Sequence, residues 1–175
     1  MRLFIAILFD EITIQNIKAV QERFKKLGCG NFTVEDNLHL TLVFLGEISQ
    51  DRLSKIQRII DEVSEKSFHL AFDRVGRFQR EGGDIWWIGM QQNMELEQTQ
   101  YRLSSKLKLA DFILENRSFT PHITLVRKFI SSEELDLKHL MGQMFTTRVT
   151  AICLMQSQRI DGRLIYTQLY KKELR

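Results

Sequence analysis

The sequence predicts an α+β protein in which antiparallel sheets carry helices on their outer faces. Apolar runs of strand length, such as residues 3–9, alternate along the chain with segments whose apolar residues recur at helical spacing. Turn sequences rich in Gly and Asp join neighbouring strands as hairpins, which favours antiparallel pairing. One short pattern also occurs twice, which indicates two similar halves.

The first part of the chain has the pattern of a strand, a helix and a second strand. Residues 3–9 are continuously apolar, as expected of a strand that is covered on both faces. Asp10 stands at the N-cap position of a helix that Gly28 ends. The next strand is expected around residues 39–45, where Gly46 stops it.

The remainder of the chain continues this alternation of helices and strands. The expected elements are a helix capped by Ser49, alternating residues 68–72, a turn at 80–84 into a strand at 85–89, a helix at 93–114, a strand at 119–129, and a hairpin of residues 149–155 and 164–170 around Asp161-Gly162. The hairpins indicate that the sheets are largely antiparallel.

The repeated pattern has the core His-apolar-Thr-Leu-Val. It occurs at residues 39–43 and again at residues 122–126, each time after a helical segment and within a strand-like run. We therefore expect residues 1–175 to form a single domain made of two similar lobes, each contributing one His-x-Thr-x motif. A pseudo-twofold axis would relate the two antiparallel sheets and place both motifs in a central cleft.

Composition excludes several classes of protein. With 43% hydrophobic and 27% charged residues, the chain is typical of a globular domain rather than a disordered one. The apolar run at residues 3–9 is too short to span a membrane. The two cysteines lie far apart without a CxxC motif, which favours a reducing compartment, so we expect a cytoplasmic protein. We also expect a monomer. The net charge of +3 is compatible with a nucleotide or RNA ligand.

The two motifs provide the groups that phosphoester chemistry needs. Residues i and i+2 of a strand share a face, so His39 projects beside Thr41 and His122 beside Thr124. Near neutral pH one imidazole can accept a proton while the other donates one. The threonine hydroxyls can donate hydrogen bonds to non-bridging phosphate oxygens. This arrangement requires neither a metal nor a cofactor.

Two other interpretations of the motifs stay open. Repeated histidines can be structural residues of a duplicated fold that has no chemistry. They can also ligate zinc, although threonine is a poor zinc ligand and no cysteine or carboxylate lies beside either motif as an obvious third ligand. His69 and His139 lack the accompanying threonine, and we interpret both as structural or surface residues.

At these residues the sequence resembles the 2H phosphoesterase superfamily, which is named for two His-x-Thr-x motifs. Within it, the sequence is most similar to the bacterial and archaeal RNA 2′,3′-cyclic phosphodiesterases, also described as 2′–5′ RNA ligases. The likeness extends to the opening residues 2–7 and to the longer segments 37–47 and 119–127. The resemblance implies a bilobal α+β fold. It also implies an enzyme that hydrolyses a 2′,3′-cyclic phosphate end of RNA to a 2′-phosphomonoester.

The resemblance also implies residue roles. His39 would donate a proton to the 3′-oxygen, and His122 would accept the proton of the attacking water. Arg127 also matches the family pattern and would bind the phosphate with Thr41 and Thr124. Strand parity places Arg127 on the face opposite His122, so this contact requires a bulge or a strand end between them. Residues 77–80 and the pair at 86–87 offer aromatic and cationic groups for a base or ribose, with at least one tryptophan expected in the core. The alternatives are 2′–5′ RNA ligation at the same site and a non-catalytic nucleotide- or RNA-binding module.

Overall fold

The structure, a computed structural model, describes residues 1–63 and 66–175 and confirms the α+β class. Its helices and strands follow each other in the order β1 (Arg2–Ile7), α1 (Glu11–Lys25), β2 (Cys29–Phe32), η1 (Glu35–Asn37), β3 (Leu40–Glu47), η2 (Gln50–Arg52), α2 (Leu53–Asp61), β4 (Phe68–Phe78), β5 (Asp84–Met90), α3 (Met94–Leu109), β6 (Ile123–Ile130), α4 (Leu137–Met141), β7 (Phe145–Val149), β8 (Ala151–Ile160) and β9 (Arg163–Glu173).

The strands form one antiparallel sheet whose two halves mirror each other. The strand order is β7-β4-β5-β6-β3-β1-β8-β9, with β2 added on β6. In each half a central strand, β1 or β5, separates a motif strand from a longer outer strand. The halves meet where β3 pairs with β6, and the residues in register there are Leu40 and Ile123. The predicted pair of related sheets is therefore joined edge to edge.

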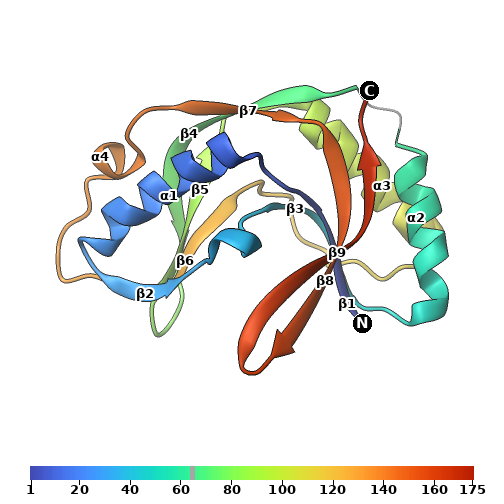
Figure 1. Cartoon of the computed structure of the whole chain (residues 1–175), viewed down its shortest axis with the longest axis horizontal. Helices are drawn as coiled ribbons and strands as arrows, with labels where there is room; N and C mark the ends of the chain where they lie inside the picture. The colour runs from blue at the N-terminus through green and yellow to red at the C-terminus, as the bar shows by residue number, and fades with distance from the viewer. Residues whose placement is uncertain (64–65) are drawn as a thin grey trace.

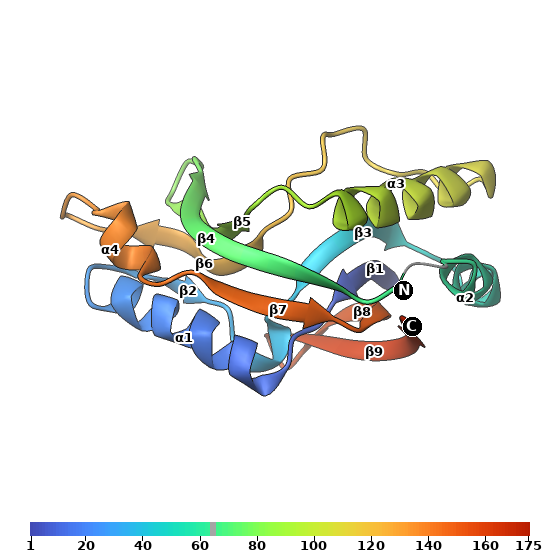
Figure 2. The same ribbon diagram turned by 90° about the horizontal axis from the view of Figure 1, so that it is seen from above.

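The helices cover the two ends of this sheet. Helices α1 and α4 lie over the half that contains β4 to β7, whereas α2 and α3 lie at the other end (Figure 1). Seen from above, the strands run between these two groups of helices (Figure 2). None of the helices in the described part of the chain combines the length and the apolar character needed to span a bilayer.

The chain crosses between the halves rather than completing one before starting the next. Helix α1 follows β1, but it contacts β6 and β7 in the other half. Helix α3 follows β5 and in turn contacts β3 and α2 in the first half. Strand β4 likewise pairs with β5, and β8 returns to pair with β1. Each half is therefore completed by segments from both parts of the sequence.

The buried first strand has the two covered faces that its sequence predicts. Leu3, Ile5 and Ile7 belong to the main core, while Phe4 and Ala6 belong to a small apolar cluster on the opposite face. That cluster also includes Cys153 and Met155 of β8, with Phe44 and Tyr166 packed against it. The second face of β1 thus lines the side of the sheet on which the first motif lies.

The predicted boundary signals hold only in part. Gly46 lies within β3 rather than ending it, α1 ends at Lys25 before Gly28, and the N-cap of α2 is Arg52 rather than Ser49. Asp10 accepts a hydrogen bond from the Thr13 N–H at 2.8 Å and caps α1, as predicted. The helix expected at residues 93–114 ends at Leu109. The strand expected at residues 119–129 begins only at Ile123, because Pro121 has no N–H to offer a strand ladder.

The exchange of helices predicts that half of the chain does not fold alone. A fragment of residues 1–90 contains α1 but lacks β6 and β7, so the apolar face of α1 would be left in water. We expect this fragment to show no cooperative thermal transition by circular dichroism and little amide protection, whereas the full chain shows both. A cooperatively unfolding fragment would contradict the prediction.

Candidate active site

The two motif histidines lie on either side of the joint between the halves. His39 immediately precedes β3, and His122 immediately precedes β6. Because Leu40 and Ile123 pair in antiparallel register, the two motifs run in opposite directions away from a local twofold axis. The structure therefore brings together two motifs that are 83 residues apart in the sequence.

Both imidazoles are held by a main-chain carbonyl two residues earlier. His39 Nδ1 lies 2.7 Å from the Asn37 carbonyl oxygen, and His122 Nδ1 lies 2.6 Å from that of Thr120. A carbonyl oxygen only accepts, so Nδ1 carries the proton in both rings and Nε2 is left for other partners. For His39 that partner is the Thr41 hydroxyl, 3.0 Å from Nε2, as motif spacing predicts.

Aromatic rings enclose each histidine. His39 contacts the rings of Phe4 and Tyr166, with centroids 5.0 and 5.2 Å away. His122 contacts Phe78 and Trp87, with centroids 5.1 and 6.0 Å away. Each imidazole is therefore half-buried beside apolar surfaces rather than free in water.

This environment disfavours the charged form of both rings. Burial is the main reason that the pKa of His39 is lowered, although the hydrogen bond to Asn37 opposes the change. Burial likewise lowers the pKa of His122 against the opposing bond to Thr120. The positive charge of Arg127 lowers both pKa values further, which places this guanidinium within electrostatic reach of both imidazoles.

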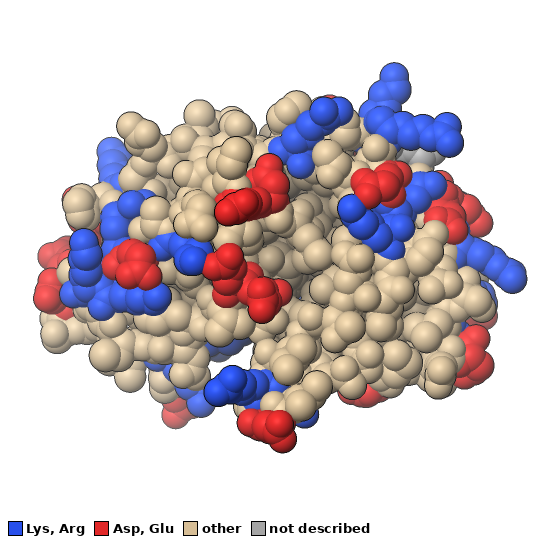
Figure 3. Space-filling model, viewed as in Figure 1, with Lys and Arg blue, Asp and Glu red and all other residues tan. Residues whose placement is uncertain are grey.

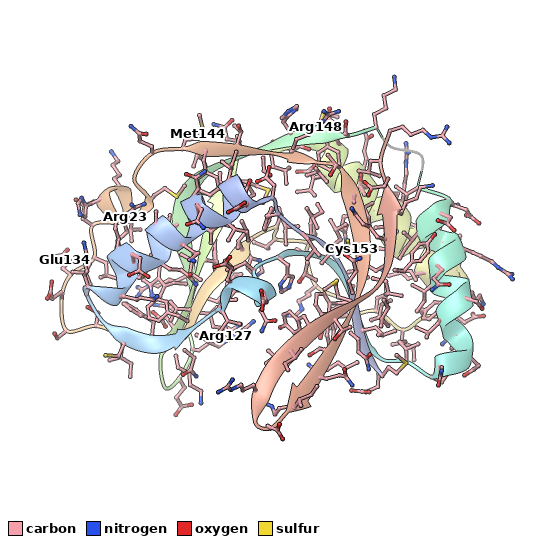
Figure 4. The ribbon with its side chains drawn as sticks, in the orientation of Figure 1. Arg23, Arg127, Glu134, Met144, Arg148 and Cys153 are labelled. Carbon is pink, nitrogen blue, oxygen red and sulfur yellow. The ribbon has the colours of Figure 1, made fainter. Side chains whose placement is uncertain are left out.

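A β-bulge turns Arg127 toward the histidines. In the pairing of β5 with β6, Trp87 is opposite Thr124 and Trp86 is opposite Val126, so Leu125 is an extra residue. The alternation of faces reverses there, and Arg127 takes the face of Thr124. Strand alternation alone predicts the face opposite His122 for Arg127, unless a bulge intervenes. The structure contains that bulge at Leu125. Figure 4 labels Arg127 on the side from which the β8–β9 hairpin projects.

The first motif has the same bulge but a different side chain after it. Ile5 pairs with Val43 and Ala6 with Thr41, which leaves Leu42 as the extra residue. Phe44 then occupies the position that corresponds to Arg127, with the Arg2 guanidinium 5.0 Å from its ring centroid. The frame of the site is thus nearly symmetric, while its charge is not.

The two adjacent tryptophans have different roles. Trp86 is buried against Phe24 in the core, as expected for at least one of the pair. Trp87 lies on the face of His122 and packs flat over Gly76, where an added Cβ would come 2.3 Å from the indole ring. Phe78 contacts Trp87, and the Arg80 guanidinium lies 5.8 Å from the Phe78 ring centroid.

Arg77 and the two other histidines lie outside this cluster. Arg77 pairs with Asp84 and lies near the ring of Trp86 rather than Trp87. His69 and His139 are exposed, in agreement with their interpretation as surface residues. Within residues 1–63 and 66–175, no three His, Cys, Asp or Glu side chains gather in a way that would hold a metal ion.

Three residues around His39 were not singled out from the sequence as site residues. Phe4 lies in an apolar run that carries no signal of a site, and Asn37 lies in the segment that resembles the family without matching a His-x-Thr-x position. Tyr166 reaches the site through the register of the β8–β9 hairpin, which no local pattern specifies. The doublets Leu42-Val43 and Leu125-Val126 were the available signal for the bulges, because two adjacent buried residues break strand alternation.

Comparison with known sequences places the chain in a family. The family described as LigT like Phosphoesterase matches it twice, over residues 9–87 and again over residues 88–166. The chain belongs to the LigT-like phosphoesterase family. It is 34% identical over 141 residues to the RNA 2′,3′-cyclic phosphodiesterase of Escherichia coli, covering 80% of this chain and 77% of that protein. It is 30% identical over 128 residues to the enzyme of the same name from Archaeoglobus fulgidus, covering 73% and 72% respectively.

Solved structures of LigT-like proteins share the whole fold. A crystal structure of Escherichia coli LigT complexed with 3′-AMP aligns with a TM-score of 0.85 at 29% identity, covering 99% of this chain and 97% of that chain. A crystal structure of a protein from Thermus thermophilus has the same TM-score of 0.85 at 23% identity, covering 99% of this chain and 98% of that chain, and supports the fold alone. Each of the two family matches contains one of the two His-x-Thr-x motifs.

The enclosed imidazoles give a prediction about proton binding. Because burial lowers the pKa of both histidines, His39 and His122 should each titrate with a midpoint below about 6.5, the ordinary value for histidine. Inorganic phosphate bound between them should raise both midpoints, since an anion favours the imidazolium form. Histidine proton resonances followed by NMR against pH measure this, with His39→Gln and His122→Gln for assignment. Midpoints above about 6.5 in the free protein would contradict it.

Proposed function

We propose that this LigT-like protein hydrolyses 2′,3′-cyclic phosphate ends of RNA to 2′-phosphomonoesters without a metal. The observation that carries the proposal is the pair of His-x-Thr motifs held across the β3–β6 joint, with both Nδ1 atoms bound to main-chain carbonyls. The relatives named RNA 2′,3′-cyclic phosphodiesterase and the neighbour complexed with 3′-AMP support the reaction and the substrate class.

The two histidines divide the proton transfers. His122 takes a proton from a water molecule through Nε2, and the water oxygen forms a new bond to phosphorus. His39 gives a proton to the 3′-oxygen as the bond between that oxygen and phosphorus breaks. The 2′-oxygen keeps the phosphate, so the product is a 2′-phosphomonoester. The chain's resemblance to the family supports this assignment, because the near-twofold geometry treats the two rings alike.

The phosphate itself is held by Thr41, Thr124 and Arg127. The two hydroxyls come from opposite sides of the local twofold axis and donate to non-bridging oxygens, where negative charge builds in the transition state. Arg127 adds a permanent positive charge on the same face because of the Leu125 bulge. This charge stabilises the pentacoordinate phosphorus without any metal ion.

The lowered pKa values of the two histidines are compatible with His122 as the proton acceptor and His39 as the proton donor. A neutral His122 is ready to accept a proton, and burial keeps it neutral. His39 must be protonated to act as the donor, and the anionic cyclic phosphate restores its charge by raising its pKa in the complex. In the neutral state the Thr41 hydroxyl, 3.0 Å from Nε2, donates to the His39 ring. When Nε2 is protonated it donates to the 3′-oxygen instead, and the Thr41 hydroxyl is then free to donate to a non-bridging oxygen.

RNA joining through a 2′–5′ linkage is the second candidate function. Joining is the reverse type of displacement, in which a nucleoside hydroxyl takes the place of water. It requires room for a nucleoside on both sides of the phosphate. Half-buried aromatic rings do stand on both sides, with Tyr166 beside His39 and both Phe78 and Trp87 beside His122. This observation favours joining as a side activity of the same site.

We also propose that residues 1–175 form one domain of two related lobes, active as a monomer in the cytoplasm. The two separate family matches and the exchanged helices support the single domain. Both motifs come from the same chain, so one copy supplies the complete pair of histidines. Cys29 and Cys153 are free thiols, which suits a reducing compartment.

The direct test is turnover in the presence of EDTA. A 2′,3′-cyclic nucleotide incubated with the protein and excess EDTA should be converted to the 2′-phosphomonoester, which chromatography separates from the 3′-isomer. The motifs need no metal, so the rate with EDTA should equal the rate without it. If chelation abolishes turnover and zinc or manganese restores it, the two-histidine mechanism is wrong.

Removal of either histidine should abolish most of the activity. His39→Ala and His122→Ala should each lower kcat/KM by roughly 10²–10⁴-fold, the usual effect of one general acid or base. The double variant should be little worse than either single variant, since both transfers belong to one displacement.

The matched control is His69→Ala, which removes an exposed imidazole far from the motifs and should leave the rate unchanged. Circular dichroism shows whether each variant is folded, and His39→Gln serves where the smaller side chain destabilises the protein. A folded His39 or His122 variant with near wild-type activity would refute the paired mechanism.

A further inference from the structure

The β8–β9 hairpin extends beyond the sheet as a free-standing arm, which we define as residues 157–166. Pairing of β1 with β8 ends at Arg2 and Ser157, and β9 is the last strand of the sheet. Asp161 and Gly162, both at positive φ, close the arm with a tight turn. The arm projects from the body of the molecule (Figure 1).

The root of the arm is part of the candidate active site. Tyr166 contacts the ring of His39 and also that of Phe4, with centroids 5.2 and 4.9 Å away. The buried side chain of Asn37 donates a hydrogen bond of 2.8 Å to the Leu164 carbonyl oxygen. The same Asn37 holds the His39 imidazole through its main-chain oxygen. The arm is therefore fixed to the residue that orients His39.

One face of the arm continues the surface on which His39 lies. Ser157 is opposite Tyr166, and Arg159 is opposite Leu164, so these four side chains share a face. Strand alternation puts this face in line with Met155, which packs with Phe4 and Tyr166 in the cluster beside His39. Arg163 points to the opposite face, although it is on the same hairpin.

The shared face offers cations that no carboxylate neutralises. In the described part of the chain, neither Arg159 nor Arg2 takes part in an ion pair with a side chain. Arg159 uses one guanidinium nitrogen for the Gly162 carbonyl oxygen and has further donors to offer. Figure 3 shows Lys and Arg side chains around an open notch between the arm and the other half of the molecule.

We infer that the inner face of the arm binds the single-stranded RNA that precedes the cyclic phosphate, with Arg159 contacting a backbone phosphate. The inference rests on the proposed function and adds to it that the preferred substrate is an oligonucleotide rather than a mononucleotide. The RNA strand extends away from its terminal nucleotide, which binds at His39. The inner face of the arm extends away from His39 in the same way. The inner face places Arg159 beside the exposed Leu164 and the half-buried Tyr166. A cation next to apolar and aromatic side chains is the combination that binds single strands by charge and stacking.

RNA fits this face better than a protein partner does. The face is continuous with a site that already accommodates a phosphate, and its charged residue within the arm is an arginine. Two exposed aliphatic side chains, Ile160 and Ile165, alternate onto the other face with Arg163, whereas Leu164 is the exposed aliphatic side chain on the inner face of the arm. A protein that docked on the arm would use that outer face and would leave RNA kinetics insensitive to Arg159.

The test compares two substrates and two arginines. The substrates are a 2′,3′-cyclic mononucleotide and a tetraribonucleotide that ends in a 2′,3′-cyclic phosphate. We expect wild-type kcat/KM to be higher for the tetranucleotide, and Arg159→Ala to lower the ratio of the two values about tenfold, as expected for the loss of one charge-assisted contact. The slope of log kcat/KM against log salt for the tetranucleotide should become shallower by about 0.7, the loss of one phosphate contact on a single strand.

Arg163→Ala is the matched control, because it removes the same charge from the same hairpin on the opposite face. It should leave the ratio and the salt slope unchanged, and Arg159→Lys should retain most of the salt slope. Equal effects of the two alanine variants, or no preference of the wild type for the tetranucleotide, would overturn the inference while leaving the proposed function intact. Hydrolysis of neither substrate by the wild type would refute the proposed function itself.

Discussion

The single antiparallel pair of Leu40 with Ile123 is the contact on which the rest of the site depends. Both residues are fully buried, so the joint between the halves has a dry apolar centre. Each motif histidine comes one residue before this pair, immediately before its strand begins. The distance between the imidazoles is therefore set by main-chain pairing rather than by flexible loops. A rigid frame of this kind suits a reaction in which two proton transfers must be aligned on one phosphorus atom.

The twofold frame supports an asymmetric reaction because equivalent positions carry different side chains. Ala6 stands opposite Thr41, whereas Trp87 stands opposite Thr124. Phe44 follows the first bulge and Arg127 follows the second. One half therefore presents a small apolar surface, and the other presents an indole and a positive charge. The repeated motif supplies two matching imidazoles. In the proposed mechanism, the different side chains around them separate the side of the leaving oxygen from the side of the attacking water.

The amino-acid sequence by itself determined the class of fold and the central residues. Apolar runs, the Asp10 cap and the Asp161-Gly162 turn are local signals, and local hydrogen bonding and burial enforce them. The repeated His-x-Thr pattern identified the four motif residues, because strand alternation places i and i+2 on one face. The double family match and the mirrored sheet agree with that repeat.

Only the tertiary structure decided how these pieces meet. Parity within a strand predicts one face for Arg127, but the register of β5 against β6 inserts Leu125 and reverses it. Tyr166 contacts His39, and the Asn37 side chain bonds the Leu164 carbonyl oxygen, although more than 120 residues separate the partners in each case. The exchange of α1 and α3 between halves is likewise invisible to local pattern. Register and long-range packing are settled by the whole core together, so no single segment encodes them.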